Sequence, residues 1–434
     1  MKLIINPKRE EWKSLIKRPA ISLKKEMLDT VSEIIRNVEK NGDAAVREYA
    51  QRFDNVSLDS FEVSLQEIEN SEFEIDESLQ AAILAAAANI RSFHAAQLAK
   101  TIEVETIPGV KCYQRTLPIH SVGLYIPGGT APLFSTVLML AIPAQIAGCK
   151  EIILCTPTDK NGKVAPAVLF AARICGVHKI YKIGGAQAIA AMSCGTESIP
   201  KVNKIFGPGN SYVTLAKQLV ATENVAIDMP AGPSEVLILA DESADTEFIA
   251  ADLLSQAEHG YDSQTILVCN SRKIAADVLS QIYLQLEQLS RAEFAKISLT
   301  NSRAFVFDNT DDMIAFSNCY APEHLIISMS NYNKIAEQIE SAGSVFLGNW
   351  TPESAGDYAS GTNHTLPTNG WAESYSGVNL DSFTKKITFQ EITPSGLQNI
   401  GPIVETMALA EGLDAHSNAV TIRLGKLSND QNDL

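Results

Sequence analysis

Apolar and polar positions along the chain follow two alternating patterns. Short apolar runs that end in glycine, proline or aspartate predict buried strands, and longer stretches with apolar residues every three or four positions predict helices. The first series has strands in SVGLYIPGG, EIILCTP, KIYKIGG and KIFGPGN, with helices in APAVLFAARICGV, AQAIAAMSCG and SYVTLAKQLVATE. The second has strands in EVLILAD, QTILVCN, AFVFDN, HLIIS and SVFLG, with helices near 245–259, 271–290, 309–319 and 332–341.

Strand–helix alternation of this length predicts parallel sheets with helices on both faces. We therefore expect an α/β protein with two doubly wound, Rossmann-like parallel-sheet domains and small N- and C-terminal modules. Helical patterns at 21–52 and 76–99 precede the first series, which suggests that one domain is inserted in the other. The acidic stretch between them, LDSFEVSLQEIENSEFEID, is predicted as a short strand and turns, and a last helix is expected near 399–411. The expected division is an N-terminal arm (1–20), a first α/β domain (21–124 with 236–378), an inserted α/β domain (125–235) and a C-terminal module (379–434).

The composition of the chain argues against nucleic acid and membranes as binding partners. The 434 residues carry a formal net charge of −16, which argues against a nucleic-acid surface. The longest apolar stretch, VLMLAIPAQIAG, contains Pro143 and Gln145 and is too short for a membrane span. The seven cysteines are scattered without a CxxC spacing, and MKLIINPKREEWK lacks an apolar core of signal-peptide length. We expect a cytoplasmic protein with reduced thiols.

The stretch SQAEHGYDSQ at 255–264 places polar side chains where a helix should bury apolar ones. Steps of three and four continue the apolar face of Leu253 to Gln256 and His259. Unpaired buried polar groups are costly, so these side chains need partners. One interpretation is an ordinary helix end, with Gly260 as the C-cap and His259 at the negative end of the helix. The other is a binding site.

Three glycine-containing turns, YIPGG, IGGAQ and GPGNS, each follow a predicted strand and precede a predicted helix. Ligands of parallel α/β sheets bind at the carboxyl ends of the strands, where backbone N–H groups can approach an anion. The sequence has no GxGxxG, so these turns by themselves are weak evidence for a dinucleotide. They could equally serve only to reverse the chain.

Four histidines lie in predicted loops or helix ends with acidic or amide neighbours: His259, His324, His364 and His416. In APEHL, Glu323 and His324 are either a strand entrance or an acid/base pair with the histidine poised near neutral pH. The polar loop GDYASGTNHTLPT carries Asp357 and is too hydrophilic to pack as core, which favours a site. Two histidines, an aspartate and an amide oxygen would suit zinc, although no HExxH or Cys-His spacing supports it. We interpret the remaining histidines as structural: His94, His120 and His178.

These segments together resemble the histidinol dehydrogenase family over nearly the whole chain. The resemblance is carried by VGLYIPGGTAPLFSTVLMLAIPA, GGAQAIAA, KIFGPGNSYV, DMPAGPSEVL, DLLSQAEHGYDSQ, PEHLII, SAGSVFLG and PESAGDYASGTNH, with RPAIS and DAHSNAVTIR near the two ends. Local differences, such as Tyr261 after AEHG, leave the activity itself unaffected. The resemblance implies zinc- and NAD-dependent oxidation of L-histidinol to L-histidine through a bound aldehyde, by a homodimer with a shared active site.

The resemblance also implies roles for individual residues. Zinc would be held by Gln256, His259, Asp357 and His416, with His416 and Glu411 supplied by the partner subunit. The substrate would contact these ligands and also Ser234, His324, His364 and Glu411. The cofactor would contact Tyr125, Gln187 and Asn210. His324 would be the general base of both oxidations, and Glu323 would activate the water that attacks the aldehyde.

Three alternatives stay open at this stage. A thiohemiacetal route could use Cys112 or Cys155, although only Lys111 offers a nearby basic residue to lower a thiol pKa. A zinc hydrolase could use the same histidines and carboxylates without NAD. A non-catalytic sensor could retain the pockets but would not need Glu323 and His324.

Overall fold

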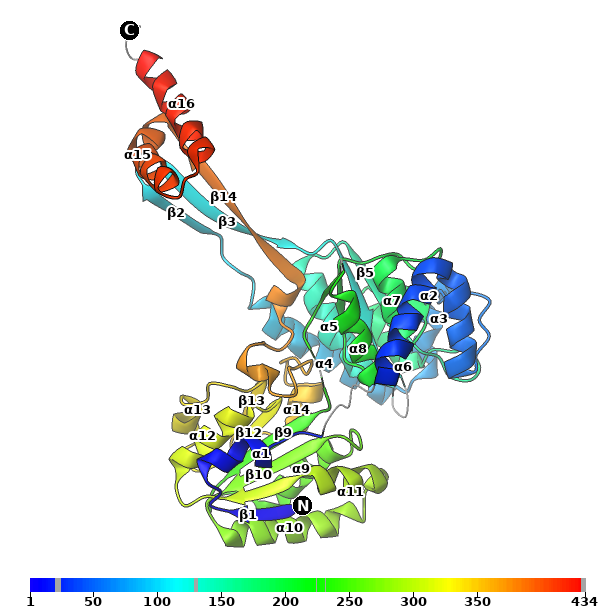
Figure 1. The fold of residues 1–434 in the computed structure, drawn as a ribbon. Helices are drawn as coiled ribbons and strands as arrows, with labels where there is room; N and C mark the ends of the chain where they lie inside the picture. Colours follow the sequence, from blue (N-terminus) through cyan, green and yellow to red (C-terminus); the bar gives the residue numbers. More distant parts are fainter. Residues whose placement is uncertain (20–24, 129–131, 224, 231, 431–434) are drawn as a thin grey trace. The chain divides into compact units, whose positions relative to one another are not determined.

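The computed structural model describes residues 1–19, 25–128, 132–223, 225–230 and 232–430, with side chains described up to residue 428 (Figure 1). The described chain forms two compact units. The first contains residues 1–97 and 119–383, and the second contains residues 98–118 and 384–434. The predicted helix start at 21–24 and the last glycine of YIPGG, Gly129, lie outside the described residues.

The first unit contains a six-stranded parallel sheet, which we name sheet A. Its strand order is β1-β11-β10-β9-β12-β13. The strands are β1 (Lys2–Ile5), β9 (Glu235–Ala240), β10 (Gln264–Cys269), β11 (Arg303–Val306), β12 (His324–Ser328) and β13 (Ser344–Leu347). Its helices are α1 (Trp12–Leu15), α9 (Thr246–Ala257), α10 (Arg272–Leu286), α11 (Ala292–Asn301), α12 (Thr310–Tyr320), α13 (Tyr332–Ala336) and α14 (Glu353–Tyr358). Separate apolar clusters under α9–α11 and under α1, α12 and α13 show that both faces are covered.

A second parallel sheet in the same unit, sheet B, has the order β6-β5-β4-β7-β8. The strands are β4 (Ser121–Tyr125), β5 (Glu151–Thr156), β6 (Lys179–Lys182), β7 (Lys204–Phe206) and β8 (Ala226–Ile227). The helices are α2 (Lys25–Tyr49), α3 (Leu65–Asn70), α4 (Glu77–Ala95), α5 (Phe134–Ala147), α6 (Pro166–Ile174), α7 (Gly185–Cys194) and α8 (Ser211–Val220). One apolar cluster joins α4, α5 and α6, and another joins α2, α7 and α8, so this sheet too is covered on both faces.

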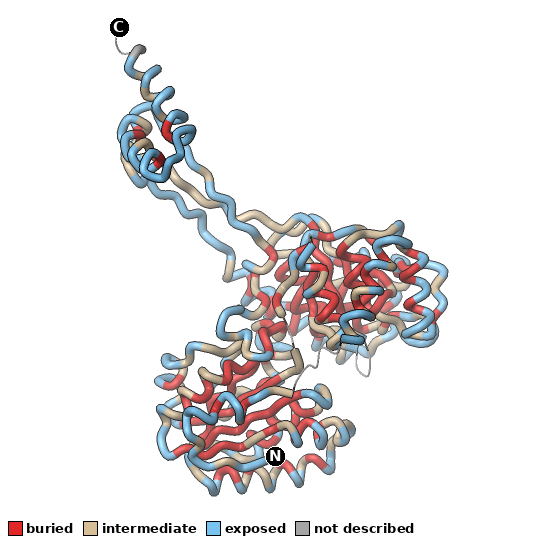
Figure 2. Tube along the Cα trace, in the orientation of Figure 1, coloured by how far each residue is buried: buried red, intermediate tan, exposed pale blue. Residues whose placement is uncertain are grey.

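Strands β4, β9, β10 and β12 are buried along their whole length, as expected of central parallel strands (Figure 2). Helix α5 is buried from Ser135 to Ala144, which explains the longest apolar stretch as core. Within the described residues, no helix has the length and apolar character needed to cross a membrane.

The second unit is a three-stranded antiparallel sheet, β14-β3-β2, with two helices. Its strands are β2 (Ile102–Ile107), β3 (Val110–Pro118) and β14 (Thr384–Ile392), and its helices, α15 (Pro394–Ala410) and α16 (Asp414–Asp430), pack against each other. Gly109, at φ +82°, makes the turn between β2 and β3 in a conformation that favours glycine. Most of the described residues of this unit are exposed to solvent (Figure 2).

The predicted fold class is confirmed, including the insertion, because β1 joins sheet A before the chain builds sheet B. The division within it differs from the expected one. The segment 1–20 supplies strand β1 to sheet A, and helices α2–α4 pack on sheet B, since buried side chains such as Val38 and Ile90 complete its two cores. Residues 102–118 belong to the second unit, where β3 pairs with β14 and β2 pairs with β3.

The acidic stretch after α2 is mainly helical, which corrects the prediction of a strand and turns. Ser64 caps α3 by accepting the N–H of Glu67, and the Glu67 carboxylate accepts the N–H of Ser64 in return. This capping box satisfies two backbone donors that would otherwise be unpaired. Only one isolated bridge, Glu62 with Tyr181, remains of the predicted strand within the described residues.

Candidate active site

The end of helix α9 shows whether the polar residues of SQAEHGYDSQ form an ordinary helix end or part of a site. Leu253 and Gln256 are both fully buried on one helix face, as the spacing predicted. The helix ends at Ala257 with Glu258 as its C-cap residue, and Gly260 does not have a positive φ. The interpretation of Gly260 as the C-cap is therefore wrong, and Gln256 needs polar partners of its own.

Gln256 finds these partners in the core of sheet A. In the orientation that satisfies its hydrogen bonds, its amide N–H₂ donates to Glu353 Oε1 and its carbonyl accepts from the backbone N–H of Glu235 at 3.1 Å. Glu235 begins β9, and the same N–H also donates to Glu323 Oε2 at 2.8 Å. The amide of Gln256 is thus held beside two of the site's carboxylates.

The predicted pair Glu323 and His324 enters strand β12, next to β9 in the sheet. Both side chains are buried, at 6% and 3% exposure. His324 Nδ1 donates to the backbone carbonyl of Glu235 at 3.2 Å, and this contact fixes the ring orientation. Nε2 makes no well-formed hydrogen bond among the described residues, and the carboxylate of Asp357 lies near it. The two peptide groups of Glu235 therefore orient both predicted catalytic side chains.

Short helix α14 adds two carboxylates on one face, Glu353 and Asp357, four residues apart. Asp357 Oδ1 lies 3.3 Å from His324 Nε2, and Glu353 Oε1 lies 3.9 Å from Nδ1. One potential ligand atom from each of His324, Glu353 and Asp357 lies within 4.8 Å of the others. This grouping contains only one of the predicted metal ligands, Asp357.

Buried charge dominates the electrostatics of this cluster. Burial, followed by the charges of Glu235 and Asp357, raises the pKa of Glu323 to about 8 in spite of His324. Burial lowers the pKa of His324, but Glu353, Glu323 and Asp357 more than offset it and raise that pKa to about 10. Burial also raises the pKa of Glu353, whereas His324 holds that of Asp357 below its usual value against the effect of burial. So many carboxylates around one imidazole favour a bound cation.

The other predicted residues of the first unit lie around this cluster. His364 Nδ1 donates to the Asp357 carbonyl at 2.8 Å, and Nε2 accepts from the Thr136 hydroxyl of α5 at 3.2 Å. Burial lowers the pKa of His364. His259 is exposed just beyond α9, yet surrounding protein atoms lower its pKa by partial loss of hydration, with Asp357 opposing. Ser234 directly precedes β9 and is half-buried.

The donor set fits zinc. An imidazole, a carboxylate and an amide oxygen are ligand types that zinc accepts, and four such groups complete its usual coordination. Gln256, His259 and Asp357 all belong to the first unit. The buried Nε2 of His324 lacks a well-formed hydrogen bond among the described residues, so the cluster still has an unused polar atom that a bound group could contact. Glu411 and His416 belong to the second unit, where both side chains are exposed at the junction of α15 and α16.

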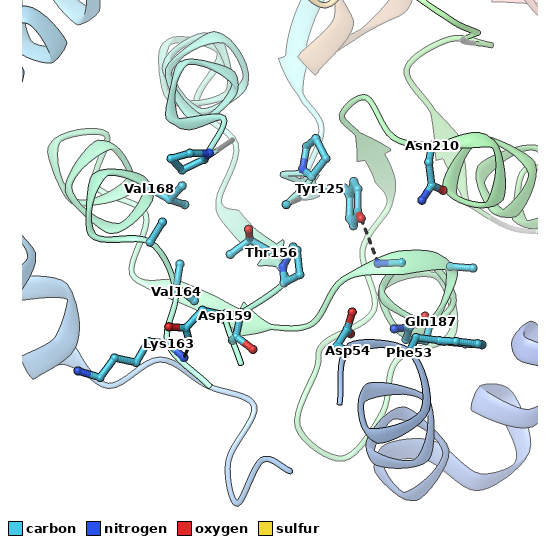
Figure 3. Close-up of a pocket in the computed structure, with 18 of the residues that line it drawn as sticks. Phe53, Asp54, Tyr125, Thr156, Asp159, Lys163, Val164, Val168, Gln187 and Asn210 are labelled. Atoms are coloured by element: carbon cyan, nitrogen blue, oxygen red, sulfur yellow. Dashed lines mark hydrogen bonds between the residues drawn. The ribbon is translucent and has the colours of Figure 1, made fainter. Parts of the chain in front are cut away.

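A cavity of about 1050 Å³ lies at the carboxyl ends of the strands of sheet B (Figure 3). All three predicted cofactor contacts line it: Tyr125, Gln187 and Asn210. The hydroxyl of Tyr125 accepts the N–H of Gly185 at 3.0 Å, and Asn210 caps α8 by accepting two backbone N–H groups. The three residues that the family resemblance implied as cofactor contacts thus lie in one cavity, and their contact with a cofactor stays a prediction.

The GPGN turn beside this cavity is stabilised by two buried charged side chains. Lys217 and Asp228 form a buried ion pair, Lys217 donates to the carbonyl of Gly207, and Asp228 accepts the N–H of Gly207. Gly207 has φ +122°, and a Cβ atom there would collide with the carbonyl of Tyr125. Glycine is required at this turn because the backbone of β4 approaches so closely.

The cysteine alternative finds no support in the geometry. Cys155 is completely buried, and burial raises the pKa of its thiol far above the usual value, which disfavours the thiolate. Cys112 lies on β3 of the second unit. All seven cysteines are free thiols.

Three residues of the site escaped sequence reasoning: Glu235, Glu353 and Arg18. The spacing of Glu353 and Asp357 after Pro352 in PESAGDY, a helix start with two acids one turn apart, could have revealed Glu353. Nothing in the sequence near Arg18 connects it with β9. Arg18 binds both carboxylate oxygens of Glu235, donates to the Tyr320 carbonyl at 2.6 Å and stacks on the Tyr320 ring.

Replacing Arg18 with methionine should lower the free energy of unfolding by about 3–5 kcal/mol, because Glu235 would remain buried without its cation. Burial already raises the pKa of Glu235 more than Arg18 lowers it. Urea unfolding of the two proteins measures the difference. Glu235 begins β9, and its peptide groups orient Glu323 and His324. Arg18→Met should therefore also lower kcat more than it raises the KM for substrate, with partial rescue by Arg18→Lys.

Arg9→Met provides the matched control. Arg9 pairs with Asp312 on the surface, where the arginine is 69% exposed, so its loss should cost no more than about 1 kcal/mol. An Arg18→Met protein as stable as the Arg9→Met protein would contradict the role given to the buried pair.

Comparison with known proteins identifies the same kind of protein by independent means. The sequence profile of the histidinol dehydrogenase family matches residues 17–424. The histidinol dehydrogenase of Bacteroides thetaiotaomicron is 58% identical over 427 residues, which cover 98% of this chain and 100% of that protein. That of Vibrio vulnificus strain YJ016 is 51% identical over 417 residues, 96% of each chain. A crystal structure of histidinol dehydrogenase from Elizabethkingia anophelis, 53% identical, covers 99% of both chains with a TM-score of 0.96.

Proposed function

The chain belongs to the histidinol dehydrogenase family and is an NAD-dependent oxidoreductase, and from this premise we propose that it oxidises L-histidinol to L-histidine in two steps, through bound L-histidinaldehyde, with reduction of two NAD. This reaction completes histidine biosynthesis. The observation that carries the proposal is the pairing of Glu323 and His324 on the Glu235 backbone, beside Gln256 and Asp357.

Zinc is the proposed metal, one per subunit, held by Gln256, His259 and Asp357 and by His416 of the partner subunit. When bound, it supplies a fixed point of attachment for the amino and imidazole nitrogens of the substrate and a positive charge among the carboxylates. That charge also opposes the effect of Asp357 on His324, which favours the neutral imidazole that a general base requires.

His324 is the proposed general base. Its Nδ1 is committed to the carbonyl of Glu235, so Nε2 is the atom that accepts the hydroxyl proton as the carbinol carbon loses a hydride to NAD. The same nitrogen accepts a second proton when the hydrated aldehyde is oxidised. A histidine suits this repeated duty because its ordinary pKa lies near neutral pH. A cation bound among Glu353, Glu323 and Asp357 would lower the pKa of His324 from about 10 toward that range.

Glu323 is the proposed activator of water between the two oxidations. Its Oε2 is held by the N–H of Glu235, and its carboxylate lies 3.6 Å from His324. It removes a proton from the water that attacks the aldehyde carbon, which yields the hydrate. Ser234, His364 and Glu411 of the partner subunit orient the hydroxyl and amino groups of the substrate.

The cavity of sheet B is the proposed site of NAD, with contacts from Tyr125, Gln187 and Asn210. The protein acts as a homodimer, because two of the proposed site residues lie in the second unit and serve the partner's site. Its seven free cysteines support a reducing compartment, and we propose the cytoplasm.

Stoichiometry tests the proposed function. Purified protein with zinc, L-histidinol and excess NAD should form two NADH for each L-histidine, measured by absorbance at 340 nm and by amino-acid analysis. One NADH with accumulated aldehyde would contradict the second step. No NADH at all would favour a zinc hydrolase or a sensor built on the same residues.

A further inference from the structure

The wall of the cavity contains an unexplained carboxylate, that of Asp54, near Gln187 (Figure 3). Phe53 and Asp54 end the π-helical turn η2 (Ala50–Asp54), which follows α2, and both line the cavity (Figure 3). Asp54 is half-buried, and it makes no hydrogen bond or ion pair within the part of the chain that the structure describes. Burial raises the pKa of this carboxyl.

The other carboxylates of the cavity differ from Asp54. Asp159 already accepts the backbone N–H groups of Asn161 and Lys163, at 2.9 and 2.8 Å, and so shapes its own loop. Glu74 is exposed to solvent. Asp54 is therefore the half-buried acceptor among them whose hydrogen-bonding capacity is unused, and a buried acceptor without donors is costly unless a ligand supplies them.

Its neighbours indicate what kind of ligand this is. The Phe53 ring is 45% exposed and stacks on Tyr49 with centroids 5.6 Å apart. The guanidinium of the exposed Arg52 lies 5.3 Å from the Phe53 centroid, so a planar ligand would pack on this ring by displacing that side chain. Asp54 lies close enough to Tyr125 that its charge helps burial to raise the pKa of that phenol to about 12. The N-terminus of the ten-residue helix α7, which suits a diphosphate, lies beside Tyr125 through Gly185.

We propose that Asp54 and Phe53 hold the adenosine half of NAD, and that Asp54 makes the enzyme selective for NAD over its 2′-phosphorylated form. The carboxylate accepts hydrogen bonds from the ribose hydroxyls, and the phenylalanine ring packs against the adenine. This inference rests on the proposed placement of NAD in this cavity.

Charge explains the selectivity. Among the described residues, the charged side chains that line the cavity are those of Asp54, Glu74, Asp159 and Lys163, so carboxylates outnumber amines. A phosphate on the ribose 2′-oxygen would meet the Asp54 carboxylate at close range in a half-buried setting, where like charges repel strongly. It would also lose the hydroxyl that donates to Asp54, as in other dinucleotide sites that use an acid to bind the ribose.

Steady-state kinetics of Asp54→Asn with zinc-loaded enzyme and L-histidinol tests the inference. We expect the KM for NAD to rise about 10- to 100-fold, the effect of losing hydrogen bonds to a charged group. The ratio of kcat/KM for NAD to that for NADP should fall at least about 10-fold, because the repulsion is removed. The KM for L-histidinol and the kcat at saturating NAD should change less than about twofold, since they depend on other residues.

Two further variants separate the causes. Asp59→Asn removes the same charge from an exposed position outside the cavity, and it should leave the NAD/NADP ratio unchanged. Phe53→Leu should raise the KM for NAD without changing that ratio, because it touches the base and not the ribose.

Measurement of ADP-ribose binding tests the role of Asp54 even if the protein does not oxidise L-histidinol. Calorimetric titration with ADP-ribose, which carries the adenosine and diphosphate without nicotinamide, should show about 10-fold weaker binding to Asp54→Asn than to the original protein. An original protein that binds ADP-ribose but forms no NADH would overturn the proposed function alone. A folded Asp54→Asn protein with unchanged ADP-ribose affinity and an unchanged NAD/NADP ratio would overturn this inference alone.

Discussion

Removal of the metal should abolish NADH formation from L-histidinol, and zinc should restore it. Fixing a substrate against its reaction partner can lower a barrier by about 7–11 kcal/mol, so loss of the anchoring metal should reduce the rate by more than about 10³-fold. The measurement is NADH formation before chelation, after dialysis against a chelator with metal content checked by elemental analysis, and after addition of zinc. Circular dichroism confirms that the depleted protein is still folded.

Two neighbouring carboxylates of α14 provide a sharp control. Asp357 belongs to the proposed ligand set, whereas Glu353 is bound to Gln256 and lies near His324. Asp357→Asn should lose most of its zinc, and Glu353→Gln should retain it. If instead Glu353→Gln loses its zinc and Asp357→Asn keeps it, the metal site would have to be reassigned to the group formed by His324 and Glu353. Full activity in metal-free protein would remove zinc from the mechanism.

Substitution of Glu323 by glutamine should separate the two oxidations. Glutamine has the same shape and can still accept the N–H of Glu235, but it cannot take a proton from water. General-base catalysis contributes about 10²–10⁴-fold, so formation of L-histidine should fall by about that factor while oxidation of the alcohol falls less than about 10-fold. Single-turnover NADH formation and trapping of the aldehyde with a hydrazine measure the two steps.

His324→Gln is the companion variant. If His324 is the base of both oxidations, this change should slow the two steps together, in contrast to Glu323→Gln. Equal loss of both steps in Glu323→Gln would remove the water-activating role from Glu323 and leave it as a support for His324.

Several features of this protein follow from the sequence by itself. Apart from β1 and β8, the strands of both parallel sheets were predicted from continuous apolar runs, because burial on both faces leaves no room for polar positions. The roles of Tyr125, Gln187 and Asn210 came instead from the resemblance to a known family. The sequence pattern showed only that their three turns follow strands, whose carboxyl ends meet at one edge of a parallel sheet. Gln256 stood out because an amide on an apolar helix face must have a partner. The inferences about the strands and about Gln256 depend only on local periodicity and on the chemistry of one side chain.

Other features were decided by the tertiary structure. Strand β1 has no apolar run that distinguishes it from an extended arm, and it became a strand by pairing with β11, about 300 residues away. Helices α2–α4 have amphipathic faces that would suit either sheet, and only the shape of the core determines which sheet they cover. The antiparallel pairing of β3 with β14 likewise joins segments distant in sequence. Arg18 and Glu353 matter because they approach Glu235 and Gln256 in space. Sequence periodicity shows which face of an element is buried, but the partner of that face is selected by contacts between segments that the sequence does not place next to each other.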